Sequence, residues 1–354
     1  MEIENTFSIR TFSIEKYHEL ALDSGAEIFT IGYSNENRPI EVLKKGSGKL
    51  KVLFIARIHG NEPATTQALL EFFKDNDFDG IEAYGIFLAN PDGAALYEQL
   101  WLKNPEPFWG NNFSDARLNF NKVDINRDWL ELSQNETRAI QEFIISLRPD
   151  YAVDMHEYYW GESGYPPKYP TDDADGFMVT MTDAPFFGAD EFVKYITEES
   201  MNYLIPKLER EFNWKIKPRH FLGTSRDSYE NPSFLGIYLS LRGIPKLLIE
   251  TWGVGCSTLF LEKRIEFHKK ALSYLISWIE DNKKAFLLRV DKPVEMEFNY
   301  IDMDLEKFNS FSGLLIQHGI KGEIVGDKFI VHTISSEKGF INTIYFLIFE
   351  RTDN

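Results

Sequence analysis

Lys51-Val-Leu-Phe-Ile-Ala-Arg-Ile58 is a mainly apolar run that leads directly into His59-Gly-Asn-Glu62. Three further apolar runs end in the same way, and they are residues 83–89 before Asn90-Pro-Asp-Gly93, residues 151–155 before His156, and residues 246–249 before Glu250. Short apolar runs of this kind predict buried strands of a mostly parallel sheet. In an open α/β sheet, ligands bind beyond the carboxyl ends of the strands. We therefore expect these two histidines and two glutamates to converge on one crevice.

This set of side chains suits zinc chemistry. Two histidines and one carboxylate with an open fourth position form a catalytic zinc site. A second carboxylate can serve as the base for a zinc-activated water. Each motif also has an ordinary interpretation, because His59-x-x-Glu62 is short enough to arise by chance and a histidine at a strand end often only forms a hydrogen bond. Their shared placement at strand ends favours the metal site.

Glu250 follows the aliphatic run Leu247-Leu-Ile249. Burial of a carboxylate there costs free energy unless the group is paired or functional, and a general base is a function that fits. Asp154 lies two residues before His156, on the same face of the predicted strand, where it can fix the tautomer of the imidazole. Glu157 points the other way and is a weaker candidate for a ligand.

Asp124-Ile-Asn-Arg-Asp-Trp129 is a polar motif between the second and third of these runs. Arg127 offers a planar fork for a substrate carboxylate, and Asn126 offers an adjacent amide donor. The alternative is a structural ion pair of Arg127 with Asp124 or Asp128.

The bulk composition limits the possible functions. A net charge of −17 argues against a general nucleic-acid binder and against binding to anionic membranes. The single cysteine, Cys256, excludes an intramolecular disulfide. Because no stretch approaches a membrane span of about 20 apolar residues, and because the charged N-terminus lacks a hydrophobic signal core, we expect a soluble, cytoplasmic protein.

The pattern along the chain predicts two regions. Strand-like runs occupy residues 27–31 and 40–43, a Gly-Ser-Gly turn follows at 46–48, and helices are expected after Pro63, from a capping box at Ser133-Gln-Asn-Glu136 to about Leu147, over 189–212 and over 258–283. The expected domain at 1–285 is therefore α/β. Alternating short runs after Phe286 predict a small β-rich appendage at 286–354.

The ordered motifs resemble those of the zinc metallocarboxypeptidases, the funnelin family. They are His59-x-x-Glu62, Asn90-Pro-Asp-Gly93, Asp124-x-Asn-Arg-Asp-Trp129, His156 and Glu250, and the resemblance covers roughly residues 50–280. It implies a three-layer α/β/α sandwich around a mixed, mostly parallel sheet of eight strands. It also implies one zinc ion per chain on His59, Glu62 and His156, a carboxylate anchor at Asn126 and Arg127, and Glu250 as the general base.

The chain departs from the family pattern in two places. The family's carbonyl-polarising arginine is missing from Leu100-Trp-Leu-Lys-Asn104, so Lys103 or Arg117 must replace it, and we favour Arg117. The family's substrate tyrosine has two candidates, Tyr229 and Tyr238, of which Tyr238 lies in a stretch similar to bacterial members. Arg226 is a further candidate for binding a carboxylate.

Three functions remain open on these grounds. The leading one is a carboxypeptidase that hydrolyses a C-terminal peptide bond with zinc-activated water. The second is an N-acyl amino acid deacylase of the succinylglutamate desuccinylase and aspartoacylase type, which resembles the same fold and motif set. The third is an inactive binding module on that fold. The expected partner is a peptide or N-acyl amino acid substrate.

Overall fold

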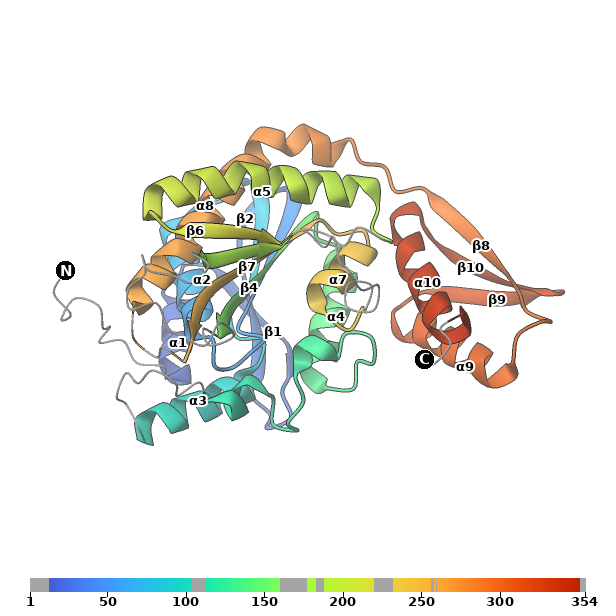
Figure 1. Ribbon diagram of the computed structural model, residues 1–354, viewed down its shortest axis with the longest axis horizontal. Coiled ribbons are helices and arrows are strands. Elements are labelled where there is room, and N and C mark those ends of the chain that lie inside the picture. The colour runs from blue at the N-terminus through green and yellow to red at the C-terminus, as the bar shows by residue number, and fades with distance from the viewer. Residues whose placement is uncertain are drawn as a thin grey trace.

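The computed structural model describes residues 13–103, 113–159, 177–182, 188–219, 232–255, 258 and 260–350 (Figure 1). The strands are β1 (Glu27–Tyr33), β2 (Pro39–Ala56), β3 (Asp79–Ile86), β4 (Tyr151–Tyr159), β5 (Phe177–Thr182), β6 (Lys215–Arg219), β7 (Lys246–Val254), β8 (Pro293–Asn299), β9 (Lys321–Val325) and β10 (Lys328–Ile334). The helices are α1 (Ile14–Leu22), α2 (Pro63–Asp75), α3 (Pro91–Lys103), α4 (Asn135–Leu147), α5 (Glu191–Phe212), α7 (Leu235–Leu241), α8 (Leu261–Leu287), α9 (Leu305–Gln317) and α10 (Lys338–Tyr345). Short 3₁₀ turns lie at Ser114–Arg117, Ile125–Arg127 and Ser335–Glu337, and a π-helical turn at Phe346–Glu350. None of the helices in these ranges is long and apolar enough to cross a membrane.

The larger unit is a mixed seven-stranded sheet with helices on both faces, which confirms the predicted α/β/α sandwich. Its order is β1-β2-β4-β7-β5-β6, with β3 also paired to β2. The pairs β2–β4 and β4–β7 are parallel, so the carboxyl ends of these three strands lie at one edge. That edge carries the residues that follow β2 and the last residues of β4 and β7, which the apolar runs predicted.

The long strand β2 accounts for the eighth strand that the family resemblance implied. The first arm of β2, residues 42–46, runs antiparallel to β3, because its partners descend from residue 86 to residue 82. The second arm, residues 50–55, runs parallel to β3, because its partners rise from residue 81 to residue 86. The chain therefore reverses at the predicted Gly-Ser-Gly turn, and its two arms flank β3. Gly46 has φ +84°, and a Cβ on Gly48 would lie 2.1 Å from the backbone of Gly80, so this turn requires glycine.

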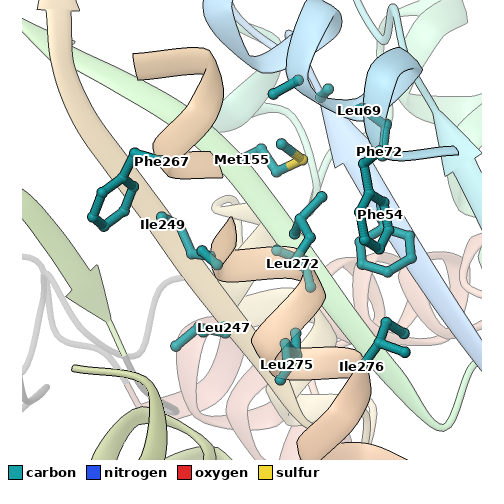
Figure 2. Close-up of a cluster of buried hydrophobic side chains, with 14 of the residues drawn as sticks. Phe54, Leu69, Phe72, Met155, Leu247, Ile249, Phe267, Leu272, Leu275 and Ile276 are labelled. Atoms are coloured by element: carbon teal, nitrogen blue, oxygen red, sulfur yellow. The ribbon is translucent and has the colours of Figure 1, made fainter. Parts of the chain in front are cut away.

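Alternate residues of each central strand face two different cores, as period-two geometry requires. Val52 and Phe54 of β2 pack with α2, α5 and α8 in one core, whereas Leu53 and Ile55 pack with α4 and α7 in the other. Figure 2 shows the first core, where Phe54, Phe72 and Leu272 meet between the sheet and the helices. Both strand faces are covered, which is why the strands read as nearly continuous apolar runs.

The predicted capping box at Ser133 is wrong, although the helix that it marked is real. Gln134 is the N-cap of α4, and its side chain makes no capping hydrogen bond. Instead the Asp128 carboxylate accepts hydrogen bonds from the backbone N–H groups of Ser133 and Gln134 and from the hydroxyls of Ser133 and Thr137. A carboxylate at a helix N-terminus is favoured by the unpaired N–H groups there. Asp128 is therefore a structural cap and has no ion pair with Arg127.

The C-terminal unit contains the predicted antiparallel strands, in the order β8-β10-β9, but two helices cover one face of its sheet. Neither α9 nor α10 was predicted from the sequence. The unit begins after residues 288–292, since α8 continues to Leu287, two residues beyond the predicted boundary. Phe311, Phe329 and Phe340 share one buried core with α4 and α7 of the larger unit. In Figure 1 the C-terminal unit accordingly lies against the α4 and α7 side of the molecule.

His318, the C-cap of α9, is a contact between the two units. Its ring is buried against Tyr238 and Phe340, and Nε2 lies 2.9 Å from the carbonyl oxygen of Leu130. Burial lowers the pKa of His318 to about 4, and the nearby charge of Arg242 acts in the same direction. The unfolded chain therefore binds more protons than the folded chain between the ordinary histidine pKa, about 6.5, and this lowered value.

We expect this histidine to make the fold sensitive to acid. Its contribution to stability is complete above about pH 6.5 and is lost as the pH falls toward the folded-state pKa, which amounts to about 2 kcal/mol at pH 5. Urea unfolding at pH 7 and pH 5 should show that the wild-type free energy of unfolding falls by about this much more than that of His318→Gln. Other titrating groups are common to both proteins and cancel. Equal pH dependence of the two proteins would contradict the expectation.

Candidate metal centre

The loop between β2 and α2 places His59 and Glu62 at the carboxyl edge of the sheet. Arg57 follows β2 with a left-handed φ of 58°, and its Nε donates to the carbonyl of Gly60 at 3.0 Å, which closes the loop. Glu62 is the N-cap of α2, and Pro63 occupies the first helical position, where its missing N–H costs nothing. The side chains of His59 and Glu62 are both almost completely buried.

His156 joins these two residues from the neighbouring strand β4. Glu62 Oε1 lies 2.6 Å from His59 Nδ1, and Oε2 lies 3.0 Å from His156 Nδ1. The two Nδ1 atoms are 3.2 Å apart. Ligand atoms at the corners of a tetrahedron around zinc, with bonds of about 2.0–2.1 Å, would be about 3.3 Å apart. The three side chains thus form one group that could hold a metal ion.

The outer nitrogens of both imidazoles face carboxylates. His59 Nε2 lies 3.1 Å from Asp124 Oδ1, and His156 Nε2 lies 2.8 Å from Asp154 Oδ1. A carboxylate at Nε2 favours the proton on that nitrogen, so the Nδ1 lone pairs point inward. Two lone pairs and a carboxylate then converge, which is an acceptor set that fits a divalent cation. The expected partner of His156, Asp154, is confirmed at this position.

The electrostatics of the group favour a positive charge at its centre. Burial opposes the charged form of Glu62, but His59 and His156 outweigh it and hold the pKa of this carboxyl well below its ordinary value. Burial likewise disfavours a charged His156, yet Asp154 and Glu62 raise the pKa of its imidazole well above the ordinary value. A metal cation bound by the same atoms would be stabilised by the same negative charges.

Arg117 reaches this group from the 3₁₀ turn at Ser114–Arg117. Its Nε and Nη2 donate to Asp124 Oδ2 at 3.1 and 2.9 Å, and its Nη1 lies 3.2 Å from His59 Nδ1 and 3.7 Å from Glu62 Oε1. About a third of the side chain is exposed. The guanidinium therefore borders the candidate metal position and retains a solvent-facing side. The competing candidate, Lys103, is the last residue of α3.

Asn126 and Arg127 lie on the next 3₁₀ turn, beside the same group. Asn126 is buried, with Nδ2 3.3 Å from His156 Nε2 and Oδ1 accepting from the backbone N–H of Leu235. The Arg127 guanidinium stacks on the Phe234 ring, 3.9 Å from its centroid. Its nearest approach to the Asp124 carboxylate is 3.9 Å, which is too long for a hydrogen bond. Because Asp124 is bound more closely by Arg117 and His59, and 46% of the Arg127 side chain is exposed, this guanidinium is available to a ligand.

Glu250 lies on β7 directly opposite His156 in the parallel register of β4 and β7. It is partly exposed, and its carboxylate accepts a hydrogen bond from the hydroxyl of Thr180 at 3.2 Å. Burial lowers the pKa of Arg127, and the charges of Asp124 and then Glu250 oppose that shift. The Glu250 carboxylate is therefore near enough to act on the charge of Arg127, and its strand position is beside His156.

The structure does not bring Tyr238 to this group. Tyr238 is completely buried on α7, where its ring contacts Trp129, His318 and Phe340 and its hydroxyl accepts from Arg242. It faces the C-terminal unit. Arg226 and Tyr229 lie outside the described residues.

One buried ion pair beneath the site was not predicted. Glu157 follows His156 on β4, and its carboxylate pairs with Arg264 of α8 and accepts from the backbone N–H of Ala64 at 3.0 Å. Its own N–H donates to Glu62 Oε2 at 3.0 Å. A Cβ on Gly253 would lie 1.9 Å from this carboxylate, so β7 needs glycine there. The Glu157–Arg264 pair links β4, α2 and α8. It therefore holds the candidate ligands His156 and Glu62 in place.

A His–Glu–His group at strand ends, which could hold a metal ion, is an arrangement that hydrolytic zinc sites also use. Residues 19–178 match the model of the zinc carboxypeptidase family. Among curated relatives, a probable carboxypeptidase 2 from Trichophyton verrucosum is 25% identical over 273 residues, which cover 72% of this chain and 48% of the relative. Carboxypeptidase 2 from Trichophyton rubrum matches at the same identity over 46% of its length. The matches confirm the resemblance to this family, and the chain spans about half the length of these relatives.

Solved structures agree on the fold. Metallo-carboxypeptidases from Burkholderia cenocepacia and Pseudomonas aeruginosa superpose with a TM-score of 0.56 at 15% and 18% identity, over 77% of this chain and 70% of theirs. Bovine thrombin-activatable fibrinolysis inhibitor superposes with a TM-score of 0.54 at 14% identity, over 78% of this chain and 98% of its own.

Proposed function

We propose that the protein is a zinc-dependent carboxypeptidase that hydrolyses the C-terminal amide bond of a peptide. The observation that carries this proposal is the convergence of His59, Glu62 and His156 as an acceptor set, with Glu250 and an exposed Arg127 beside it. The names of the curated relatives support the same reaction.

Each residue has a role in this proposal that follows from its place. Zinc held by His59, Glu62 and His156 would supply Lewis acidity, which polarises a carbonyl and lowers the pKa of water. Glu250, partly exposed beside His156, would take a proton from the attacking water and pass it to the leaving amine. Arg117 would donate to the oxygen of the scissile carbonyl as negative charge develops there.

The terminal carboxylate of the substrate would pair with Arg127. The Phe234 ring holds this guanidinium flat, and Nη1 donates to the carbonyl of Asn126, so its orientation is set before a ligand arrives. Asn126 stays an anchor candidate, although its Oδ1 is already bound to α7. Such a preset fork favours substrates with a free C-terminal carboxylate over amidated ones.

A hydrolysis screen of the zinc-loaded protein tests the proposed reaction. We expect cleavage of N-acylated dipeptides that end in a free carboxylate, and little cleavage of the same dipeptides with a C-terminal amide. Hydrolysis of N-acyl amino acids alone would indicate the deacylase instead. No hydrolysis of any substrate by zinc-loaded protein would indicate an inactive binding module.

Arg127→Lys is expected to lower kcat/KM for free-carboxylate substrates, with a loss of transition-state stabilisation of about 2–5 kcal/mol. The reason is that an ammonium cannot reproduce the two parallel hydrogen bonds of the guanidinium fork. Amidated substrates, which lack the carboxylate, should lose far less, so they serve as the internal control. Steady-state kinetics with matched substrate pairs measure both effects. An equal loss for both substrates, with zinc retained, would show that Arg127 is structural.

A further inference from the structure

A second cavity lies between the larger unit and the C-terminal unit. It has a volume of about 220 Å³ and is lined by the ends of α4, α7 and α8 together with Ile334 and Glu337. Its lining residues Asp150 and Ile244 precede β4 and β7, whereas His156 and Glu250 lie near the other ends of these strands. The cavity is therefore at the opposite edge of the sheet from the candidate metal centre.

Two buried donor atoms, one on the lining residue Arg289 and one on Ser336 beside it, have no hydrogen-bond partner among the described residues. Arg289 Nη1 donates to the carbonyl of Gly243, but Nη2 makes no hydrogen bond and lies 3.5 Å from Asp291 Oδ1. The hydroxyl of Ser336, which is 3% exposed, is also unpartnered. A Cβ on Gly243 would lie 2.5 Å from Ser336 Oγ and 2.9 Å from Arg289 Nη2, so both atoms border the same spot. Buried polar groups without partners are rare, and they indicate a missing ligand or water.

Two of the three lining carboxylates are already engaged. Glu337 accepts hydrogen bonds from Arg242 at 2.9 Å and from the hydroxyl of Thr333 at 2.7 Å. Asp150 accepts from the backbone N–H of Lys51 at 2.8 Å. Asp291, the third lining carboxylate, forms an ion pair with Arg289 Nη2 at 3.5 Å. The groups without a hydrogen bond are therefore donors, and a negatively charged ligand would complete them.

Arg148 adds a further donor at the cavity rim. It is the C-cap of α4 and adopts the left-handed conformation (φ 50°, ψ 68°), which favours glycine or asparagine. Its side chain is 62% exposed and lies 3.9 Å from Glu337, beyond hydrogen-bonding distance. Residues with a strained backbone cluster at ligand sites.

Part of the remaining wall is apolar and is formed by Ile144, Ile145, Ile244, Phe286 and Ile334, beside Pro149 and Tyr238. The volume corresponds to about seven water molecules at about 30 Å³ each, which is the size of a branched five-carbon acid. We propose that this cavity binds a small carboxylate with a short branched apolar body, the carboxylate meeting Arg289, Ser336 and Arg148. Inorganic phosphate shares the charge but has no group for the apolar walls.

Helix α7 connects this cavity with the proposed substrate anchor, and this part of the proposal rests on the proposed function. The helix begins beside Phe234, on which Arg127 stacks, and the backbone N–H of Leu235 donates to Asn126. It ends at Leu241, and the next two residues, Arg242 and Gly243, line the cavity. Ligand binding that shifts the end of this seven-residue helix is therefore expected to reach Arg127.

Calorimetric titration of the full chain with 3-methylbutanoate at constant ionic strength tests the binding. We expect one saturable site, with binding at least about tenfold weaker for 3-methylbutanamide, which lacks the charge. Equal binding of acid and amide, or no saturable binding, would overturn the proposal. Phosphate binding as tight as that of the acid would overturn the role of the apolar walls. Because Arg127 can also hold a carboxylate, Arg127→Met protein is titrated in parallel, and loss of the site there would place it at the anchor instead.

Two variants locate the ligand in the cavity. Ser336→Ala removes an unpartnered hydroxyl, so it should leave the melting temperature unchanged or raised while weakening the acid several-fold. Arg148→Gly removes a donor and a strained backbone, and it should weaken the acid by about tenfold. Asn213→Gly is its matched control, since Asn213 is the left-handed C-cap of α5 at φ 53°. Wild-type binding by both cavity variants, or equal weakening by Asn213→Gly, would overturn the site.

Kinetics test the connection through α7. Saturating 3-methylbutanoate should change KM for free-carboxylate substrates at least about twofold in wild type, and the concentration that gives half of this change should be several-fold higher in Ser336→Ala. An unchanged wild-type KM would overturn the connection. A failure of the proposed function would look different, because hydrolysis would then be absent without the acid while the binding isotherm remained.

Discussion

Alanine at His59 or at His156 is expected to abolish tight metal binding and, with it, hydrolysis. Each substitution removes one of three ligands and leaves Glu62 with a single imidazole partner in a buried site. Loss of one ligand from a three-ligand zinc site removes the geometry on which affinity depends. Elemental analysis of purified wild-type protein should give about one zinc per chain, and each variant should give a small fraction of that after dialysis against a weak chelator.

His332→Ala is the matched control for this experiment. His332 lies between Glu295 and Glu323 at 3.4 and 3.2 Å, but it is on the exposed face of the C-terminal sheet. It therefore has histidine and carboxylate chemistry without the buried, convergent geometry, and its loss should leave the zinc content unchanged. Full metal retention in both His59→Ala and His156→Ala would refute the metal centre.

Glu250→Gln is expected to keep the fold and the metal while kcat falls by about 10²–10⁴-fold, the usual contribution of a general base. Glutamine preserves the shape and can still accept a hydrogen bond from Thr180, but it cannot take up a proton. Steady-state kinetics with the best substrate of the screen, beside a measurement of zinc content, give the result. Near wild-type turnover would rule out this role.

Thr180→Val separates loss of the base from local disturbance. It removes only the donor at 3.2 Å and leaves the Glu250 carboxylate in place. We expect its kcat to fall by about tenfold or less, consistent with the loss of one hydrogen bond of about 0.5–1.5 kcal/mol. A loss as large as that of Glu250→Gln would mean that positioning of the side chain, and not proton transfer, explains both results.

The strand ends and the group that they carry could be predicted from local sequence. Val52, Phe54 and their neighbours are apolar at every position because both faces of the sheet are covered, so the run is visible without knowledge of its partners. The rule that ligands lie beyond the carboxyl ends of parallel strands then brought His59, Glu62 and His156 together. The helix after Pro63 was visible for a similar reason, since the proline and the apolar stripe are both local features.

The residues that support this group could not be predicted, because their contacts join distant parts of the chain. Glu157 pairs with Arg264, 107 residues away, and His59 meets Asp124 across 65 residues. The cap of α4 was assigned to the nearest suitable hydroxyl, whereas the fold supplies a carboxylate from Asp128. Sequence spacing carries no information on contacts of this kind, which arise only when the sheet order is set.

Local pattern thus determined the central strands, the two-region order of the chain and the identity of the buried His–Glu–His group. Where every residue of a helix or strand is buried, the sequence does not show which neighbour each side chain contacts. Only the tertiary packing decided that contact. Tyr238 shows the difference, because all seven residues of α7 are buried and their sequence does not say which unit each will meet. The C-terminal unit packs against this helix, so the tyrosine is enclosed by His318 and Phe340 and lies away from the strand ends. The physical reason is that periodicity records burial, whereas the direction of burial depends on neighbours that are distant in sequence.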